Sequence, residues 1–349
     1  EEEKAKLRAE GRKPAIRFNI AKAQKAFHDT SILEFEDIVK GKLHMDTNLL
    51  GDFVIQKSNG APTYNYAVVI DDMLMKISHV IRGEDHISNT YKQILIYEAL
   101  GAKVPKFGHL GMILAPDRSK LSKRHGATAV SDFVKQGYLT DALINFVALL
   151  GWAPSDGEEI KPVEKIAEDF RIHEISSSNS IFEYDKLKWM NSHYIKMLSM
   201  DELKQRLMPY LEKYDLSQLT DEQFTRMIEV TREPLVLLSD ITDAVSYFFG
   251  DSVEVEPQVQ TDVLDTETSQ EVLKTYLEQS KDWEYTEENL HEKLEAFRGY
   301  FKEKGIKPKV TMWAIRAAVT GRTRGADMTA ILAILGKEKV EKRIKAAIK

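Results

Sequence analysis

The sequence changes its pattern near residue 199. Before this point, short alternating or continuously apolar runs are separated by turn signals such as Ser-Asn-Gly at residues 58–60, which is typical of strands and hairpins. Beyond it, apolar residues recur at helical spacing, and the segment 286–304 carries one clean apolar stripe made of Leu290, Leu294, Phe297 and Phe301. This division predicts an α/β first part followed by an all-helical second part.

The same patterns predict where the individual elements lie. We expect strands over residues 15–20, 32–39, 42–45, 52–56, 64–71 and 74–82. The run 64–71 is almost continuously apolar, as in a strand covered on both faces. Expected helices cover 89–100, 142–150, 201–214, 221–231, 234–249, 269–279, 286–304 and 311–319.

Composition excludes several classes of protein. The 349 residues can form two or three domains, and no cysteine is present for a disulfide or a thiolate metal site. The sequence contains no HExxH pair, no GxxxxGK[ST] loop and no GxGxxG fingerprint, so any use of ATP must depend on another architecture. No apolar run is long enough to span a bilayer and no signal peptide opens the chain, which makes the cytoplasm the expected location.

The charge is unevenly distributed along the chain. The formal net charge is -6, but residues 251–297 carry 14 acidic and 3 basic side chains, whereas residues 298–349 carry 4 acidic and 14 basic ones. A basic end on an acidic protein is expected of a local surface that contacts phosphates. A basic helical tail that only aids solubility would have the same composition, and both interpretations stay open.

Two clusters in the first part suggest chemistry. A short apolar run, Met112 to Leu114, enters a turn at residues 115–118 and is followed by four cations, which are Arg118, Lys120, Lys123 and Arg124. Cations on such a loop can stabilise charge that develops on a phosphate, although a solvated surface loop has the same appearance. The second cluster, residues 82–86 (RGEDH), follows an expected strand and precedes a helix, where open α/β sheets bind ligands; a polar turn with a helix cap is the alternative.

The exact residues in and around these two clusters favour the functional interpretation over a surface loop and a polar turn. Residues 120–124 (KLSKR) resemble the KMSKS signature of class I aminoacyl-tRNA synthetases, and 125–128 (HGAT) continue the form seen in glutamyl-tRNA synthetases. The block 52–97 resembles the same family over its whole length, and so do 182–195 and the helical end of the chain. From about residue 15 onward the sequence is similar to bacterial glutamyl-tRNA synthetase.

The resemblance implies a set of ATP-binding residues. Lys123 would contact the phosphates and assist departure of pyrophosphate, and Lys120 would help to hold the loop closed; both are the expected catalytic residues. The remaining expected ATP contacts are Ser122, Arg124, Asp85, Met112, Ile113 and His109, with Met112 and Ile113 acting through their backbone. The string Gly108-His109-Leu110-Gly111 is not the HIGH signature, because that signature belongs to the first βα unit of the nucleotide fold; we consider the HIGH histidines absent from this sequence.

The resemblance also implies the contacts with glutamate and tRNA. Arg82 would pair with the α-carboxylate of glutamate, a task suited to the guanidinium fork, and Tyr64 would help to form the side-chain pocket. In the helical end, Arg316, Arg322 and Arg324 are candidates for RNA contact. Trp152 and Trp189 are expected to be core aromatics rather than platforms for bases.

The fold implied is a Rossmann-like catalytic half with an incomplete parallel sheet and a small β-containing insertion, followed by an all-α anticodon-binding helical bundle. The expected domains are residues 1–57 (part of the acceptor-stem-binding insertion), 58–130 (catalytic half with the KMSKS-type loop), 131–198 (stem-contact helices) and 199–349 (anticodon-binding, with a break near 250–285).

The implied reaction is ATP-dependent formation of glutamyl-adenylate and transfer of the glutamyl group to tRNA(Glu). Mg²⁺ would accompany ATP, no zinc or other protein-bound metal is expected, and the family suggests a monomer. The chain begins inside the family's acceptor-binding insertion, so we expect a C-terminal fragment that alone activates glutamate hardly at all. The alternatives are a non-catalytic tRNA-binding module, a non-discriminating enzyme that also charges tRNA(Gln), a glutaminyl enzyme, and the short tRNA-modifying paralogue.

Overall fold

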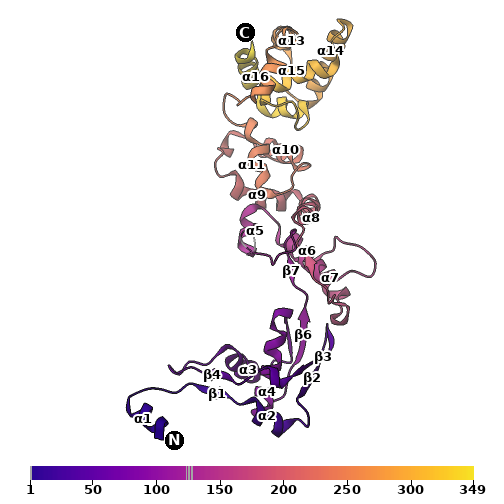
Figure 1. The fold of residues 1–349 in the computed structure, drawn as a ribbon. Helices are drawn as coiled ribbons and strands as arrows, with labels where there is room; N and C mark the ends of the chain where they lie inside the picture. The colour runs from indigo at the N-terminus through magenta and orange to yellow at the C-terminus, as the bar shows by residue number, and fades with distance from the viewer. Residues whose placement is uncertain (1, 123, 125, 127–128) are drawn as a thin grey trace. The chain divides into compact units, whose positions relative to one another are not determined.

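The computed structural model describes every residue except 1, 123, 125 and 127–128. The chain forms two compact units, which are described separately here (Figure 1). The sheet unit contains Glu1–Thr128 and Ile144–Glu183, and the helical unit contains Ala129–Leu143 and Tyr184–Lys349. No described helix is long and apolar enough to cross a membrane.

The sheet unit is built on a four-stranded mixed sheet with the order β3-β2-β6-β5. Its strands are β2 (Ile32–Asp37), β3 (Gly41–Asp46), β5 (His79–Gly83) and β6 (Lys106–Leu110). Strands β2 and β3 form an antiparallel hairpin, whereas β6 runs parallel to both β2 and β5. The expected α/β class is therefore confirmed, with one antiparallel edge strand on a parallel arrangement.

Two smaller strand pairs and several helices complete this unit. Strands β1 (Ile16–Phe18) and β4 (Phe53–Gln56) pair antiparallel, and β7 (Ile113–Leu114) and β8 (Ser180–Ile181) pair parallel. The helices are α1 (Glu2–Ala9), α2 (Ile20–Phe27), α3 (Tyr64–Leu74), α4 (Ile87–Ala99) and α7 (Val163–Asp169), together with part of α6 (Thr140–Gly151).

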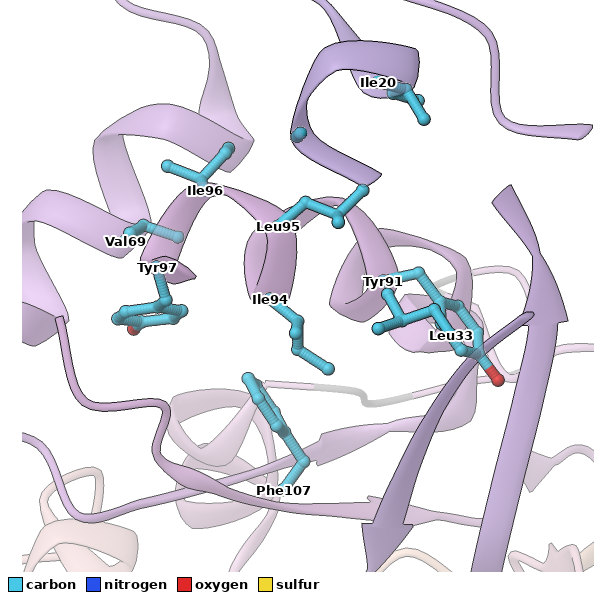
Figure 2. Close-up of a cluster of buried hydrophobic side chains, with 10 residues drawn as sticks. Ile20, Leu33, Val69, Tyr91, Ile94, Leu95, Ile96, Tyr97 and Phe107 are labelled. Carbon is cyan, nitrogen blue, oxygen red and sulfur yellow. The ribbon is translucent and has the colours of Figure 1, made fainter. Parts of the chain in front are cut away.

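Helix α4 lies at the centre of the hydrophobic core, as Figure 2 shows. One group of its side chains, including Ile94, lies on the side of the sheet residues Leu33 and Phe107, while Leu95 and Ile96 lie toward α2 and α3. Burial of such aliphatic and aromatic side chains contributes about 1.5–3 kcal/mol each. The core therefore fixes α4 against the carboxyl end of β5, where the residues of the RGEDH cluster begin.

Two of the expected strands are wrong. Residues 64–71 form helix α3, because Tyr66, Val69 and Met73 pack on the core at spacings of three and four, while Tyr64 on the other face is 51% exposed. A short apolar run does not distinguish a buried strand from a helix with one buried side. The strand expected over 74–82 is shortened to β5, because α3 continues to Leu74 and a turn with Lys76 at φ +57° follows.

The helical unit confirms the all-α second part. Its helices are α5 (Val130–Gln136), α8 (Tyr184–Met197), α9 (Met200–Leu211), α10 (Asp221–Arg232), α11 (Ile241–Ala244), α12 (Pro257–Val259), α13 (Glu267–Gln279), α14 (Glu287–Glu303), α15 (Pro308–Thr320) and α16 (Met328–Ala347). Capping boxes at Ser199 and Thr220 begin α9 and α10. The apolar stripe predicted on α14 is fully buried.

One helix expected in this unit is broken. Residues 234–249 form α11 flanked by two short 3-10 turns instead of one helix of four turns. Asp240 accepts hydrogen bonds from the backbone N–H groups of Val236 and Leu237, which stabilises the turn. Such local bonds from an aspartate side chain compete with the helical ladder.

Candidate functional site

Arg82 lies on β5 directly opposite His109 on β6, at the carboxyl ends of two parallel strands. Its Nη2 donates to Thr90 Oγ1 and to Gln93 Oε1, both at 2.7 Å, and its Nε lies 3.4 Å from His109 Nε2. The guanidinium also lies over the Phe107 ring, 5.5 Å from the centroid. Burial lowers the pKa of Arg82, but a guanidinium stays charged at neutral pH.

These contacts occupy one edge of the guanidinium. Its five N–H groups include one on Nε and two on Nη2, all directed at protein acceptors, so the two on Nη1 remain for the Tyr64 hydroxyl or a ligand. The guanidinium fork that was expected to bind the α-carboxylate is therefore already hydrogen-bonded to the protein through its Nε and Nη2 groups. The bonds hold the plane of the group, which favours a fixed orientation for an incoming carboxylate.

Tyr64 lies at the start of α3, close to the RGEDH turn. Its hydroxyl is 3.4 Å from Nδ1 of His86, and the two rings are 5.8 Å apart between centroids. The hydroxyl also raises the pKa of Arg82, in opposition to burial. Tyr64 and Arg82 thus lie close together, with His86 of the RGEDH cluster beside Tyr64, and the roles expected for Tyr64 and Arg82 in glutamate binding stay predictions.

The basic loop meets this turn through an ion pair. Leu114 and Lys120 form an isolated bridge that closes the turn at residues 115–119, in which Arg118 has φ +64°. Lys120 Nζ lies 3.3 Å from Asp85 Oδ2, with the two side chains 70% and 47% exposed. Exposed pairs of this kind contribute about 0–1 kcal/mol, so Lys120 can exchange Asp85 for another anion at little cost.

The other residues expected to bind ATP lie along β6, β7 and the loop. His109 is completely buried, whereas Ile113 is partly exposed. The backbone of Met112 is engaged by the protein, since its N–H donates to Asn179 Oδ1 at 2.7 Å and its carbonyl accepts from the Ser180 N–H. Ser122 and Arg124 follow on the loop, and Lys123 lies outside the described residues.

A second concentration of charge lies in the helical unit. An open groove of about 870 Å³ is lined by cations of α14, α15 and the following loop. The cations are Arg298, Lys307, Lys309, Arg316 and Arg324, and the other lining residues include Trp313 and a single acid, Asp327. Lys309 Nζ lies 4.3 Å from the Trp313 ring centroid. We call this set of residues the basic groove.

Only part of the basic groove was predicted from the sequence. Arg316 and Arg324 were expected to contact RNA, whereas the two lysines, Arg298 and Trp313 were not singled out. Residues 309, 313 and 316 recur at spacings of four and three on α15, which was the available signal. Asp327 is the N-cap of α16 and accepts from the N–H of Ala330, so its charge is used at the helix terminus.

Arg322 lies outside the basic groove. Its Nη2 forms an ion pair with Asp243 Oδ1 at 2.8 Å, and the guanidinium lies over the ring of Tyr247. These groups line a separate cavity of about 500 Å³. The structure therefore brings Arg316 and Arg324 together and places Arg322 elsewhere, although Arg316 is itself bound to the protein, because its Nη1 donates to the Ala326 carbonyl at 2.8 Å.

Potential metal ligands are not clustered in the described part of the chain. Within it, no three or more side chains of His, Asp or Glu are grouped so that they could hold a metal ion. The chemistry available there is that of cations, hydroxyls and carboxylates placed at the carboxyl ends of parallel strands.

Comparisons with known proteins identify the family of this chain. The family model described as "tRNA synthetases class I (E and Q), catalytic domain" matches residues 1–189, and the model described as "Anticodon binding domain" matches residues 202–348. Glutamate–tRNA ligase 1 of Caldanaerobacter subterraneus is 42% identical over 342 residues, which cover 97% of this chain and 69% of that protein. Glutamate–tRNA ligase of Bacillus subtilis is 39% identical, with 99% and 71% covered.

A solved structure supports the same relationship. The glutamate tRNA ligase of Elizabethkingia meningosepticum, crystallised in complex with its amino acid, superposes with a TM-score of 0.84 at 28% identity, covering 99% of this chain and 70% of that one. Sequence similarity thus extends over nearly the whole chain, and the fold agrees with it. The chain belongs to the glutamate–tRNA ligase family of class I aminoacyl-tRNA synthetases.

Proposed function

We propose that this chain takes part in ATP-dependent activation of L-glutamate and its transfer to tRNA(Glu), the reaction that gives its relatives their name. The observation that carries the proposal is the contact between Lys120 and Asp85, because it joins the basic loop to the turn that follows Arg82. A phosphate-binding cation and a carboxylate-binding arginine within one unit are what the first half-reaction requires.

In the proposed first step, a carboxylate oxygen of glutamate attacks the α-phosphorus of ATP and pyrophosphate leaves. Arg82 would bind the α-carboxylate of the amino acid through Nη1, with Tyr64 beside it. Lys120, together with Ser122, Lys123 and Arg124, would interact with the phosphates as negative charge shifts to the leaving group. Mg²⁺ would enter with ATP, held by phosphate oxygens.

The role proposed for the basic groove is contact with tRNA. Five cations facing one open groove supply the sequence-independent attraction to phosphates, and Trp313 offers a surface on which an unpaired base can stack. Arg316 and Arg324 belong to this surface. Arg322 lies outside it and forms an ion pair with Asp243. From the family resemblance, we also expect the protein to be a monomer, to lie in the cytoplasm and to bind tRNA(Glu).

The first half-reaction is tested by measuring glutamate-dependent ATP–pyrophosphate exchange with the natural full-length protein. We expect Lys120→Met to lower the maximal exchange rate about 10²-fold, a typical loss for one group that stabilises developing charge. Arg82→Met is expected to act chiefly on the KM for glutamate. Lys135→Met, an exposed lysine of α5, serves as the control and should leave both parameters unchanged. Exchange by Lys120→Met at the unmodified rate would contradict the proposal.

The tRNA surface is tested by binding of a tRNA(Glu) transcript at several salt concentrations. Replacing Arg316 and Arg324 together by alanine should weaken binding and reduce the slope of log K against log[salt] by about 1.5, since each cation contributes about 0.7–0.9. Lys302→Ala, which removes an exposed cation of α14 outside the groove, is the matched control. An unchanged slope in the double variant would place the tRNA elsewhere.

A further inference from the structure

A polar path crosses three neighbouring strands beneath the candidate site. It runs from Asp37 on β2 through His109 on β6 to Arg82 on β5, and the side chains of Asp37 and His109 are fully buried. His109 Nδ1 lies 2.6 Å from Asp37 Oδ2, and His109 Nε2 lies 2.9 Å from Thr90 Oγ1 and 3.4 Å from Arg82 Nε. The first part of this path lies among aromatic rings, including Phe35 and Phe107.

The contacts determine where the protons lie. Asp37 Oδ1 accepts from the backbone N–H groups of Val39, Lys40 and His109, and these bonds, with the His109 side chain, hold the pKa of Asp37 below its usual value despite burial. The ionised carboxylate can only accept, so His109 Nδ1 must carry a proton. Burial lowers the pKa of His109, and the nearby Arg82 and His86 act in the same direction, whereas the ionised Asp37 opposes the shift. His109 is therefore neutral at pH 7, and the lone pair on Nε2 faces both the Thr90 hydroxyl at 2.9 Å and Arg82 Nε at 3.4 Å.

That lone pair faces the edge of Arg82 that the protein already occupies. The neutral Nε2 accepts from Arg82 Nε, while Thr90 and Gln93 accept from Nη2. Gln93 is itself oriented, because its Nε2 donates to Asn65 Oδ1 at 3.0 Å. A protonated ring would present an N–H to the guanidinium in place of an acceptor, so the orientation of Arg82 depends on the tautomer that Asp37 selects.

We propose that Asp37 and His109 are positioning residues for Arg82: they fix a neutral imidazole whose Nε2 and neighbour Thr90 hold the guanidinium with Nη1 directed at the substrate carboxylate. The inference rests on the proposed role of Arg82 in glutamate binding. A buried histidine that only fills the core would not need hydrogen bonds to residues of the site. His109 Nε2, in contrast, contacts both Arg82 and Thr90, and Thr90 itself accepts from Arg82. Neither buried residue touches substrate in this arrangement.

The first test compares KM values for glutamate and ATP in the exchange reaction. His109→Phe keeps the ring volume and removes both nitrogens, and Thr90→Val keeps the shape and removes the hydroxyl. We expect each to raise the KM for glutamate about 10-fold or more, with the KM for ATP unchanged and partial recovery in His109→Gln. Leu95→Met, a volume-conserving change at a buried residue of the same helix, is the control for repacking and should behave like the unmodified protein.

The outcomes separate this inference from the proposed function. If Arg82→Met leaves the KM for glutamate unchanged, the proposed function of Arg82 fails. If Arg82→Met raises it while Thr90→Val and His109→Gln have normal values for both substrates, the proposed function stands and the positioning role is overturned. Since Thr90→Val does not alter the His109–Asp37 bond, the test remains available even if His109→Phe fails to fold.

A second readout is independent of activity. Long-range ¹H–¹⁵N NMR spectra of the imidazole should show a proton on Nδ1 and none on Nε2 at pH 7, in the unmodified protein and in Thr90→Val. A ring protonated on Nε2, or on both nitrogens, would overturn the inference, because Nε2 could then not accept from Arg82. The pH profile should agree: because burial lowers the pKa of His109 from its usual value, the KM for glutamate should stay constant down to about pH 6.5 and rise only at lower pH, and His109→Gln should lose this acidic limb.

Discussion

Arg343 of α16 offers the sharpest test of what holds the helical unit together. The side chain is 2% exposed, and its guanidinium donates to four backbone carbonyls that end neighbouring segments. Nη1 contacts the carbonyls of Tyr247 and Val319, each at 2.7 Å, and Nη2 contacts those of Gly250 at 2.8 Å and Phe249 at 3.3 Å. Burial lowers the pKa of Arg343 to about 10, so the group stays charged at pH 7.

The cost of removing this group follows from the acceptors left behind. Three of the four contacts are no longer than 2.8 Å, and bonds to a charged donor contribute about 1.5–3 kcal/mol each. The desolvation of the guanidinium offsets several kcal/mol of this sum. We therefore expect Arg343→Met, which conserves much of the apolar volume, to lower the free energy of unfolding by about 3–5 kcal/mol, the range found when one partner of a buried pair is removed.

Native-state hydrogen exchange measures this loss where it occurs. The amides of Ile315 and Ala318 on α15 lie in the buried part of the unit. Their protection should fall about 150- to 5,000-fold in Arg343→Met, since each tenfold corresponds to about 1.4 kcal/mol. Lys345→Met, on the same helix, removes only an exposed pair with Glu341 and should change protection less than threefold. A loss below 1 kcal/mol in Arg343→Met would refute the reasoning that these carbonyls depend on the guanidinium.

Three further predictions use the same structure. Gly321 and Gly305 each follow a helix and have similar φ values of +73° and +79°, but a Cβ at Gly321 would lie 2.1 Å from a backbone oxygen and one at Gly305 would meet nothing within 4 Å. In urea unfolding, Gly321→Ala should therefore cost at least about 2 kcal/mol more than Gly305→Ala, and equal costs would contradict the steric argument. Because burial lowers the pKa of His109, the unfolded chain binds its proton first as the pH falls below about 6.5, so the free energy of unfolding should decrease there. Urea titrations between pH 5 and 8 should show a smaller decrease in His109→Gln, and equal decreases would mean that His109 is not buried in its neutral form. Trp313→Ala should weaken tRNA binding about 5- to 150-fold if a base stacks there, corresponding to about 1–3 kcal/mol, whereas Tyr300→Ala, which removes a 39% exposed aromatic side chain of α14 outside the groove, should not; equal effects of the two would argue against stacking at Trp313.

Local patterns in the sequence were sufficient to predict much of the fold, whereas the residues of the candidate site were proposed from the family resemblance. The spacing of Leu290, Leu294, Phe297 and Phe301 predicted α14 and its buried face, because helical periodicity is a property of neighbouring residues. The strings around residues 82 and 120 identified the strand end and the basic loop, and the ion pair between Lys120 and Asp85 agrees with their expected proximity.

Other features depended on contacts between segments distant in the sequence. Residues 64–71 form a helix because a single face of the segment packs on α4, and an apolar run alone does not indicate how many of its faces will be covered. Arg322 was expected to contact RNA, but its pair with Asp243, 79 residues away in sequence, is a tertiary contact. The orientation of Arg82 likewise depends on Thr90, Gln93 and His109, and ultimately on Asp37, 45 residues earlier. Periodicity over a long segment such as α14 determines which element forms, whereas the conformation of a short apolar run and the hydrogen-bond partners of a charged side chain are decided only when the strands and helices pack together.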